Sequence, residues 1–245
     1  MGDHFSRQAD TYRRYRPHYP APFLDWVAAL APRRDLAWDV GTGNGQAAVG
    51  LAPHFRRVFA SDLSLPQLAA AETVSAVSYG LASAESSPLA AASVDLVTVA
   101  QALHWFEFDR FWSEVRRVLR PGGGVVAWCY ERAEISAVID PVFLRFHDET
   151  MAPYWPDRRA HVISGYRNIP FPFFPVATPG FALSSQWDLE HLLGYVASWS
   201  AVDRCRQRTG IDPLPGFAQE LAAAWGPRDQ VREIRWPLTV LAGRA

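Results

Sequence analysis

The residues best suited to chemistry form a glycine-rich segment near the start of the chain. The segment reads Asp39-Val-Gly-Thr-Gly-Asn-Gly45 and directly follows an apolar run, Leu36 to Val40. Glycines at alternate positions allow a tight turn and let the backbone approach a ligand, and the helix expected next points its N-terminus at that ligand. Gln46 stands where the last glycine of a dinucleotide-binding G-x-G-x-x-G pattern would fall, so the spacing departs from that pattern.

Two carboxylates beside this segment indicate the charge of its ligand. Asp39 opposes a pyrophosphate and favours a cationic amino group, which S-adenosylmethionine has and a nicotinamide dinucleotide lacks near that point. Asp62 follows the loop by about 20 residues, where an acidic side chain can take both hydroxyls of an adenosine ribose. The alternative for Asp62 is a helix cap in Asp62-Leu-Ser64. The sequence therefore favours S-adenosylmethionine over a dinucleotide.

Alternating elements surround these residues and position them. Apolar runs between helical patterns predict five strands with intervening helices, which is typical of a parallel, doubly wound sheet covered on both faces. The predicted strands span 36–40, 57–61, 74–81, 94–100 and 124–130, and the predicted helices span 21–31, 46–54, 64–72 and 108–119. Ser64 is available to cap the third of these helices. The glycine segment then follows the first strand of the sheet, which is where glycine-rich loops of such sheets approach a ligand.

The alternation ends at Tyr130, and the following stretch has a different composition. Residues 131–180 contain seven prolines and many aromatic residues, which supply the apolar mass that disordered segments lack. We expect an insertion that caps the active site. Helices are predicted at 188–200 and 215–225, and a closing strand at 233–241, in which Pro237 favours an edge or bulge position. One domain is expected, with its core at 35–130, the insertion at 131–180 and the remainder at 181–245.

Composition limits the function classes. The 245 residues, 49% of them hydrophobic, can bury one substantial core, and a net charge of -1 with a pI near 6.7 gives no broad basic surface for nucleic acid. All 24 basic residues are arginines, which excludes Schiff-base chemistry and a P-loop lysine. Cys129 and Cys205 lack zinc-ligand spacing, so they are interpreted as buried thiols and no metal is expected. The lack of a signal core or an 18-residue apolar run predicts a cytoplasmic protein without membrane contact.

Several short motifs make the resemblance to a known family specific. Asp39 to Gly45, Ser61-Asp62, Ala84-Glu85 before Pro88-Leu89, and Arg120-Pro-Gly-Gly123 resemble the successive motifs of class I methyltransferases. The match covers residues 35 to 130. The resemblance implies an α/β fold with a doubly wound, mostly parallel seven-stranded sheet, Rossmann-like, and S-adenosylmethionine as the cofactor.

The same resemblance implies an order of contacts along the cofactor. It places Asp39, Gly41, Thr42 and Gly43 by the methionine end and Asp62 on the ribose. Leu63 would then lie beside the adenine, Ala84 and Glu85 near the adenine edge, and Gln101 beside the methyl group.

A narrower resemblance rests on two further segments. Phe5-Ser-Arg7 with Tyr12-Arg-Arg-Tyr15-Arg16-Pro17, and later Gln101-Ala-Leu-His104-Trp105-Phe106, resemble the branch that contains trans-aconitate and cantharidin methyltransferases. In that branch the N-terminal segment folds over the cofactor. The resemblance implies that Tyr12, Arg16 and Tyr19 cover the donor, with Arg16 available to its carboxylate. The alternative is an aromatic and arginine segment that only packs on the surface.

The expected reaction does not require a strong base. Methyl transfer is an in-line displacement on a sulfonium carbon, so the enzyme mainly aligns the nucleophile and excludes water. A carboxylate acceptor needs no deprotonation, whereas a phenol or an acidic carbon benefits from a base, for which His104 is the candidate. The alternative for His104 is a hydrogen-bonded core histidine. We therefore expect O- or C-methylation of a small, acidic metabolite, with His104 acting as a base only on some acceptors.

The acceptor site is expected to combine arginines with aromatic walls. Candidates to meet an acidic acceptor are Arg145, Arg158, Arg159 and Arg167. Trp105 and Trp155 are the candidates for the apolar wall. Surface arginines and core aromatic residues are the alternatives.

Two other functions and the oligomeric state stay open. A nicotinamide-dependent oxidoreductase is one alternative, and a non-catalytic ligand-binding protein on the same fold is the other. Nucleic-acid base methylation is disfavoured, because Ala100-Gln-Ala-Leu-His104 lacks the Asn/Asp-Pro-Pro-aromatic motif of adenine methylases. Both a monomer and a homodimer fit the sequence.

Overall fold

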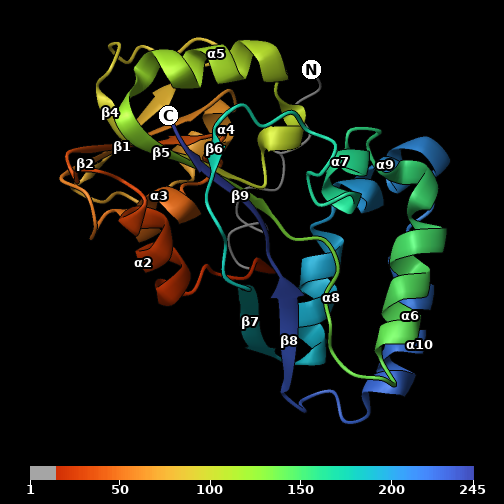
Figure 1. Cartoon of the computed structure of the whole chain (residues 1–245). Coiled ribbons are helices and arrows are strands. Elements are labelled where there is room, and N and C mark those ends of the chain that lie inside the picture. Colours follow the sequence, from red (N-terminus) through yellow and green to blue (C-terminus); the bar gives the residue numbers. More distant parts are fainter. Residues whose placement is uncertain (1–14) are drawn as a thin grey trace. The chain divides into compact units, whose positions relative to one another are not determined.

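The computed structural model describes residues 15–245, which divide into two compact units (Figure 1). The sheet unit consists of residues 19–130, 160–181 and 238–245. The helical unit consists of residues 131–159 and 182–237 together with residues 15–18 of the described chain. The division differs from the expected boundaries, because residues 160–181 of the predicted insertion pack with the sheet.

The sheet unit is built on seven strands in the order β3-β2-β1-β4-β5-β9-β6. The parallel strands are β1 (Leu36–Val40), β2 (Arg57–Asp62), β3 (Val77–Leu81), β4 (Val94–Ala100) and β5 (Leu119–Cys129). β9 (Thr239–Arg244) runs antiparallel to both β5 and β6 (Phe174–Pro175). This order confirms the predicted doubly wound, mostly parallel seven-stranded sheet.

Helices and two apolar clusters cover the sheet. The elements are α2 (Ala21–Ala29), α3 (Gln46–Leu51), α4 (Leu65–Ala69), η2 (Leu103–Trp105), α5 (Phe108–Val118) and α7 (Arg159–Ile163). Successive side chains of a strand point to opposite faces, and accordingly Trp38 packs in one cluster with Phe111 of α5 while Ala37 packs in the other with Phe23 of α2. The sheet is therefore buried on both faces, as its near-continuous apolar strands predict.

The strand order reverses at β1, whose neighbours are β2 on one side and β4 on the other. In open parallel sheets, ligands bind outside the carboxyl ends of the strands at such a switch point. The glycine loop at the end of β1 and Gln101 at the end of β4 both lie at this edge.

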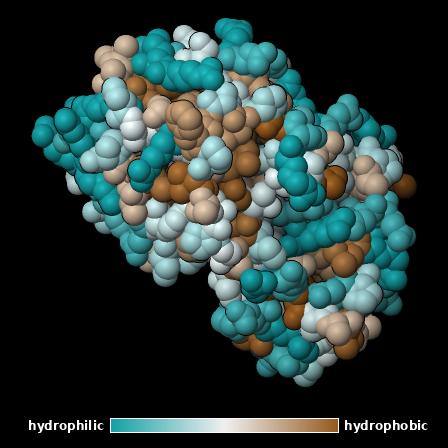
Figure 2. Space-filling model, in the orientation of Figure 1, coloured by the Kyte–Doolittle hydropathy of each residue, from teal (hydrophilic) through white to brown (hydrophobic). Residues whose placement is uncertain are grey.

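Residues 160–181 of the predicted insertion pack with the sheet unit. Phe171 and Phe173 each pack edge-on against Trp112, with ring centroids 5.6 Å apart. On the face drawn in Figure 2, hydrophobic residues reach the surface over the part of the sheet unit where β6 lies, and Phe174 of β6 is 78% exposed.

The predicted closing strand at 233–241 is two strands. β8 (Arg232–Pro237) pairs antiparallel with β7 (Ala182–Trp187) in a separate sheet of the helical unit, and β9 enters the large sheet. Pro237 ends β8, since proline has no N–H to donate to a ladder, and Leu238 N–H instead donates to Phe181 O. The expectation that Pro237 lies in one continuous strand was wrong.

The helical unit packs short helices around aromatic rings. Its elements are α6 (Asp140–Arg145), η3 (Phe146–Thr150), η4 (Ala152–Tyr154), α8 (Leu189–Ala197), α9 (Ser200–Thr209) and α10 (Leu214–Trp225). Phe146 stacks on Phe217 with centroids 4.0 Å apart, and Phe143 packs edge-on against Trp199. None of the helices in residues 15–245 is long and apolar enough to cross a membrane.

Candidate active site

The glycine loop joins β1 to α3 and is fixed by its neighbours. Gly41, Gly43 and Gly45 all have positive φ values, of 64°, 57° and 87°. A Cβ on Gly41 would lie 2.6 Å from Ala102 Cβ, so the segment after β4 leaves no room for a side chain there. Thr42 N–H donates to Ser61 O at 3.0 Å, which ties the loop to the end of β2.

Gly43 differs from its neighbours because protein packing does not demand a glycine there. A Cβ on Gly43 would meet only Gln67 Oε1, at 3.8 Å, so the bare backbone at this point suits close approach by a ligand. Asn44 Nδ2 and Gln46 Nε2 are buried and have no hydrogen-bond partner among residues 15–245. Buried donors without partners are uncommon in proteins. These features fit a ligand with acceptor oxygens held on the loop.

Asp39 is fully buried at the base of this loop. Its Oδ2 accepts a hydrogen bond from Thr42 Oγ1 at 2.5 Å and its Oδ1 accepts one from Thr98 Oγ1 at 2.7 Å. Burial raises the pKa of Asp39 to about 6, the two hydroxyls oppose that rise, and the charge of Asp62 adds to it. Asp39 therefore fixes the Thr42 hydroxyl and places a buried carboxyl group at the base of the loop.

Asp62 ends β2 and faces the same loop. Its Oδ2 accepts from Gly43 N–H and its Oδ1 from Ser64 N–H, both at 2.8 Å. Each carboxylate oxygen has further acceptor capacity, so ribose hydroxyls can bind as well. The helix cap that was the alternative role for Asp62 belongs to Ser64, whose Oγ accepts from Gln67 N–H at the start of α4.

The surroundings of Asp62 fit S-adenosylmethionine. Leu63 is 64% exposed and presents an apolar surface next to the carboxylate, as an adenine ring requires. Asp39 and Asp62 repel each other, and a ligand with cationic sulfonium and amino groups would reduce that repulsion. A pyrophosphate would increase it.

Ala84 and Glu85 form a turn that is anchored to the start of α5. Ala84 is buried, and the Glu85 carboxylate accepts hydrogen bonds from the Ser83 hydroxyl and, at 3.0 Å, from Glu107 N–H. Burial raises the pKa of Glu85, but these hydrogen bonds outweigh it and leave the pKa below its usual value. The carboxylate thus holds the turn, and contact with adenine stays a prediction.

Gln101 follows β4 in a strained backbone conformation. Its φ is +57°, which a residue with a side chain rarely adopts. Gln101 N–H donates to Trp128 O and Gln101 Nε2 donates to Tyr130 O, both at 2.9 Å. Such strain persists where the surroundings over-determine it and is frequent at functional sites. The residue links the ends of β4 and β5 beside the glycine loop.

His104 lies in η2 and is largely buried. Its Nδ1 is 3.3 Å from the hydroxyl of Tyr166, and its ring packs against Trp105 with centroids 4.9 Å apart. Tyr166 is fully buried, has a φ of +58°, and hydrogen-bonds to the Cys129 thiol. Burial raises the pKa of Tyr166 well above its usual value, so its hydroxyl stays protonated. The sequence offered no signal for this tyrosine.

The N-terminal candidates fall into three places. Tyr12 lies outside the described residues. Tyr19 belongs to the sheet unit and packs edge-on against Trp128, with centroids 5.3 Å apart. Arg16 belongs to the helical unit, where its Cζ is 5.1 Å from the centroid of the Tyr195 ring. Their contacts with the donor stay predictions.

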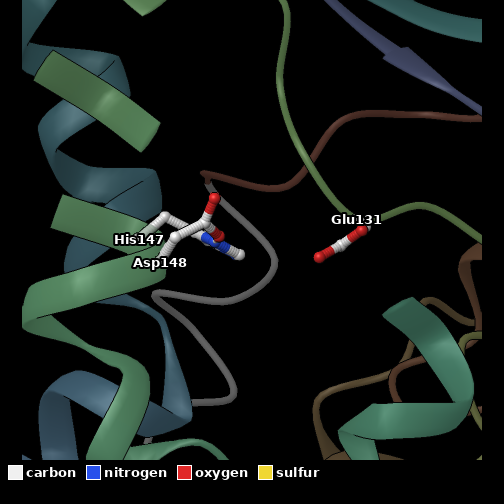
Figure 3. A group of neighbouring side chains, drawn as sticks. All are labelled: Glu131, His147 and Asp148. Carbon is white, nitrogen blue, oxygen red and sulfur yellow. The ribbon is translucent and has the colours of Figure 1, made fainter. Parts of the chain in front are cut away.

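The helical unit holds a second polar cluster around His147 (Figure 3). His147 Nδ1 is 2.6 Å from Asp148 Oδ1, and His147 Nε2 is 2.7 Å from Arg159 Nη2. The Arg159 Cζ lies 3.8 Å from the centroid of the Trp155 ring, and Trp155 Nε1 donates to His147 O at 3.1 Å. The cluster therefore contains two residues predicted for the acceptor, Trp155 and Arg159, and two that were not predicted.

Two of the other predicted arginines, Arg145 and Arg167, have no described contact with this cluster. Arg145 forms an ion pair with Glu220 within the helical unit, and both side chains are more than half exposed. Arg167 belongs to the sheet unit.

Three side chains of the cluster have the spacing of a metal site. Glu131, His147 and Asp148 each offer a ligand atom, and these atoms lie within 4.8 Å of one another; Figure 3 shows Glu131 on a separate segment from the other two. Both nitrogens of His147 are already engaged, and Arg132 Nη2 lies 3.1 Å from Asp148 Oδ2. A divalent cation beside the guanidinium groups of Arg132 and Arg159 is electrostatically unfavourable, so this arrangement does not favour a metal.

Comparison with known proteins identifies the family of the chain. The family described as methyltransferase domain matches residues 38–127. A Dictyostelium discoideum protein assigned as a methyltransferase is 30% identical over 249 residues, covering 99% of this chain and 95% of that protein. A solved structure from Anaeromyxobacter dehalogenans, assigned as a type II methyltransferase, is similar with a TM-score of 0.88 and 43% identity, covering 94% of this chain and 98% of that chain.

A further relative names the methyl donor. A Saccharomyces cerevisiae protein assigned as an S-adenosylmethionine-dependent methyltransferase is 29% identical over 133 residues, which cover 50% of this chain and 45% of that protein. Together with the acidic loop and the strand order, these matches replace the oxidoreductase and the non-catalytic alternatives. The chain belongs to the class I S-adenosylmethionine-dependent methyltransferases.

Proposed function

We propose that this methyltransferase acts on a small, acidic metabolite by O- or C-methylation, in the branch that contains trans-aconitate and cantharidin methyltransferases. The observation that carries the proposal is the gathering of Asp39, Asp62 and the Gln101 to His104 segment at the carboxyl edge of one sheet. The two carboxylates suit a cationic donor. The segment after β4 supplies the turn at Gln101 and the imidazole of His104, which we assign to the methyl acceptor.

The donor contacts follow from the positions around the loop. Asp62 accepts the ribose hydroxyls while keeping its bonds to Gly43 N–H and Ser64 N–H, and Leu63 packs beside the adenine. Ala84 and Glu85 line the adenine edge. Bound there, S-adenosylmethionine supplies a methyl group on a sulfonium sulfur, which a nucleophile displaces in line.

The methionine end is assigned to the glycine loop. Gly41, Thr42 and Gly43 present backbone to it, and Asp39 holds Thr42 from below. Asn44 Nδ2 and Gln46 Nε2 are additional donors that the sequence did not single out.

The role of His104 depends on its tautomer. For Nε2 to take a proton from an acceptor, Nδ1 must carry the other ring proton and donate it to the Tyr166 oxygen. Tyr166 can then donate its own proton to the Cys129 sulfur. In the opposite arrangement Tyr166 donates to Nδ1, and Nε2 carries a hydrogen that can only be donated. The Tyr166–Cys129 contact thus supports a base on the acceptors that need one.

Acidity of the acceptor is supported by the basic residues of the chain. All of them are arginines, which bind carboxylates through paired N–H groups. Arg159 and Trp155 form the combination of planar cation and apolar wall expected for a small acid. Arg16, in the same unit, lies over the ring of Tyr195.

A calorimetric titration followed by a product screen tests the proposal. We expect the purified protein to bind S-adenosylhomocysteine and not NADH. With S-adenosylmethionine present, we expect mass spectrometry to detect a methylated product among small carboxylic acids, phenols and carbon acids. Products confined to amines or to nucleic-acid bases would contradict an acidic acceptor, and absence of S-adenosylhomocysteine binding would contradict the donor site.

A further inference from the structure

Arg159 of the helical unit combines a buried Nε with the lack of an ion pair among the described residues. The side chain as a whole is partly buried, its Nε has no hydrogen-bond partner in residues 15–245, and none of the described carboxylates lies within 4 Å of its guanidinium. The two acidic neighbours, Glu131 and Asp148, contact Arg132 instead. Buried N–H groups of arginine are usually paired, so the Nε of Arg159 stands out.

The group that orients Arg159 carries no charge. His147 is 2% exposed, and burial together with the charge of Arg159 lowers the pKa of His147 to about 4, although Asp148 partly opposes that fall. At neutral pH its Nδ1–H therefore donates to Asp148 and its Nε2 accepts from Arg159 Nη2. His147 fixes the direction of the guanidinium without neutralising it.

The aromatic neighbour restricts the guanidinium further. Arg159 lies over the face of Trp155, whose Nε1 is in turn bound to His147 O. A guanidinium stacked on an indole keeps its N–H groups in a plane and available at its edge. One edge is used by His147, and the buried Nε–H is not used by any described residue.

Charges of both signs act on Arg159 from the described residues around it. Glu131 and Asp148 attract it from beyond ion-pair distance, and Arg16 repels it. His147, which contacts the guanidinium directly, is neutral. Burial lowers the pKa of Arg159, and an anion bound beside the guanidinium would oppose that effect.

We infer that Arg159 is a carboxylate-binding residue, held on Trp155 by the neutral His147 and its partner Asp148, and that its ligand is a carboxylate of one of the two substrates. The inference rests on the proposed function and deepens it. Two carboxylates meet the description: the amino-acid carboxylate of the donor and the carboxylate of an acidic acceptor. Either can accept two parallel hydrogen bonds from the planar N–H groups of an arginine.

Binding measurements on substituted proteins test the inference and separate the two sources. The variants are Arg159→Gln, which removes the charge, and Arg159→Lys, which keeps a charge but not the planar donor pair. Arg145→Gln is the matched control, because that arginine is exposed in the same unit and pairs with Glu220. The titrants are S-adenosylhomocysteine, 5′-methylthioadenosine, which lacks the amino-acid group, and glutarate or citrate added to protein saturated with S-adenosylhomocysteine.

If the donor carboxylate is the ligand, Arg159→Gln weakens S-adenosylhomocysteine binding by about tenfold or more and leaves 5′-methylthioadenosine binding unchanged. If the acceptor carboxylate is the ligand, S-adenosylhomocysteine binding is unchanged and binding of glutarate or citrate is lost. Arg159→Lys follows Arg159→Gln in either case, whereas Arg145→Gln behaves as the wild type. Circular dichroism establishes that each variant is folded, and Arg159→Lys provides the test should Arg159→Gln fail to fold.

Unchanged binding of all three titrants in folded Arg159→Lys or Arg159→Gln would overturn the inference. The proposed function would be unaffected by that result, because it would still rest on S-adenosylhomocysteine binding and product formation by the wild type. Conversely, a wild type that does not bind S-adenosylhomocysteine would contradict the proposed function before any variant is made.

Discussion

The carboxyl edge of the sheet unit and the His147 cluster of the helical unit hold charged groups of opposite sign. The first gathers two carboxylates, Asp39 and Asp62, and the second holds the Arg159 guanidinium, which has no ion pair with a described carboxylate. In both regions the charged group is held by neutral partners: threonine hydroxyls hold Asp39, and an uncharged imidazole holds Arg159. One region is therefore suited to a cation and the other to an anion.

Asp95 is a third charged group for comparison, and its charge has a structural role. Asp95 is as deeply buried as Asp39, but its Oδ1 is 2.6 Å from Arg120 Nη1 and its Oδ2 accepts from the N–H groups of Asp35 and Leu36. Asp95 thus ties the amino end of β1 to β4 and β5, with its charge compensated inside the protein. Asp39 and Asp95 are therefore equally buried but differ in whether a described cation compensates the charge, which is the property that we propose for a ligand-binding carboxylate.

Asp95→Ala is expected to have the largest effect, and on stability alone. The substitution leaves Arg120 without its main partner and exposes unpaired N–H groups, which costs about 3–5 kcal/mol of unfolding free energy for a buried pair. Urea denaturation measures the loss, with the exposed Asp109→Ala as control. Affinity of the folded protein for S-adenosylhomocysteine should stay within about twofold. A large loss of affinity without loss of stability would erase the distinction between Asp95 and the ligand-binding carboxylates.

Asp62→Ala is expected to have the opposite pattern. Each charge-assisted hydrogen bond to the ribose is worth about 1.5–3 kcal/mol, so S-adenosylhomocysteine binding should weaken at least tenfold, about 1.4 kcal/mol. The fold should persist, because Asp62 is only partly buried and its own bonds are to a loop and a turn. Calorimetry on Asp62→Ala and on Asp109→Ala measures the difference. Unchanged affinity would mean that the ribose is held elsewhere.

Asp39→Asn separates the effect of the Asp39 charge on donor binding from its effect on protein stability. The Asp39 pKa is raised from 3.8 to about 6, so the folded state binds more protons than the unfolded state between these values. This group therefore makes the wild type less stable as pH rises from about 4 to 6, and an asparagine removes that dependence. We expect Asp39→Asn to melt at a higher temperature than the wild type at pH 8, since it lacks the buried charge, while losing about tenfold in donor affinity.

The pH dependence of donor binding sharpens the same prediction. Wild-type affinity for S-adenosylhomocysteine should fall as pH drops below about 6, where Asp39 becomes neutral, and Asp39→Asn should lack this fall. If both proteins show the same pH profile, the Asp39 charge plays no part in donor binding.

The strands and the glycine loop could be predicted because their signals are local. Alternation of apolar runs and helical patterns gave the strand boundaries of β1 and β4 without error, and the glycine spacing marked the loop. Ser64 was recognised as a cap from its place before a helix. Local patterns of this kind depend on a few neighbouring residues and survive in any context.

The parts that were missed depend on contacts distant in sequence. Thr98 looks like any residue of an apolar strand until Asp39 lies opposite it, 59 residues away. Tyr166 meets His104 only because residues 160–181 return to the sheet. α9, Ser200–Thr209, buries only Ala201, Val202 and Cys205, which gives too narrow an apolar stripe to recognise.

Tyr166→Phe is expected to have the smallest effect, and one confined to part of the substrate range. Loss of the hydroxyl removes the acceptor that keeps the His104 proton on Nδ1. Methylation of a phenol or a carbon acid should then slow by about tenfold, within the range that general base catalysis contributes, whereas methylation of a carboxylate should not change. Tyr154→Phe in the helical unit is the control. An equal loss on both kinds of acceptor would make Tyr166 a packing residue, and among the described residues of the sheet unit only the donor edge would then take part in the chemistry. A loss confined to acceptors that must lose a proton would extend the active site to Tyr166, a residue that no local sequence pattern identifies.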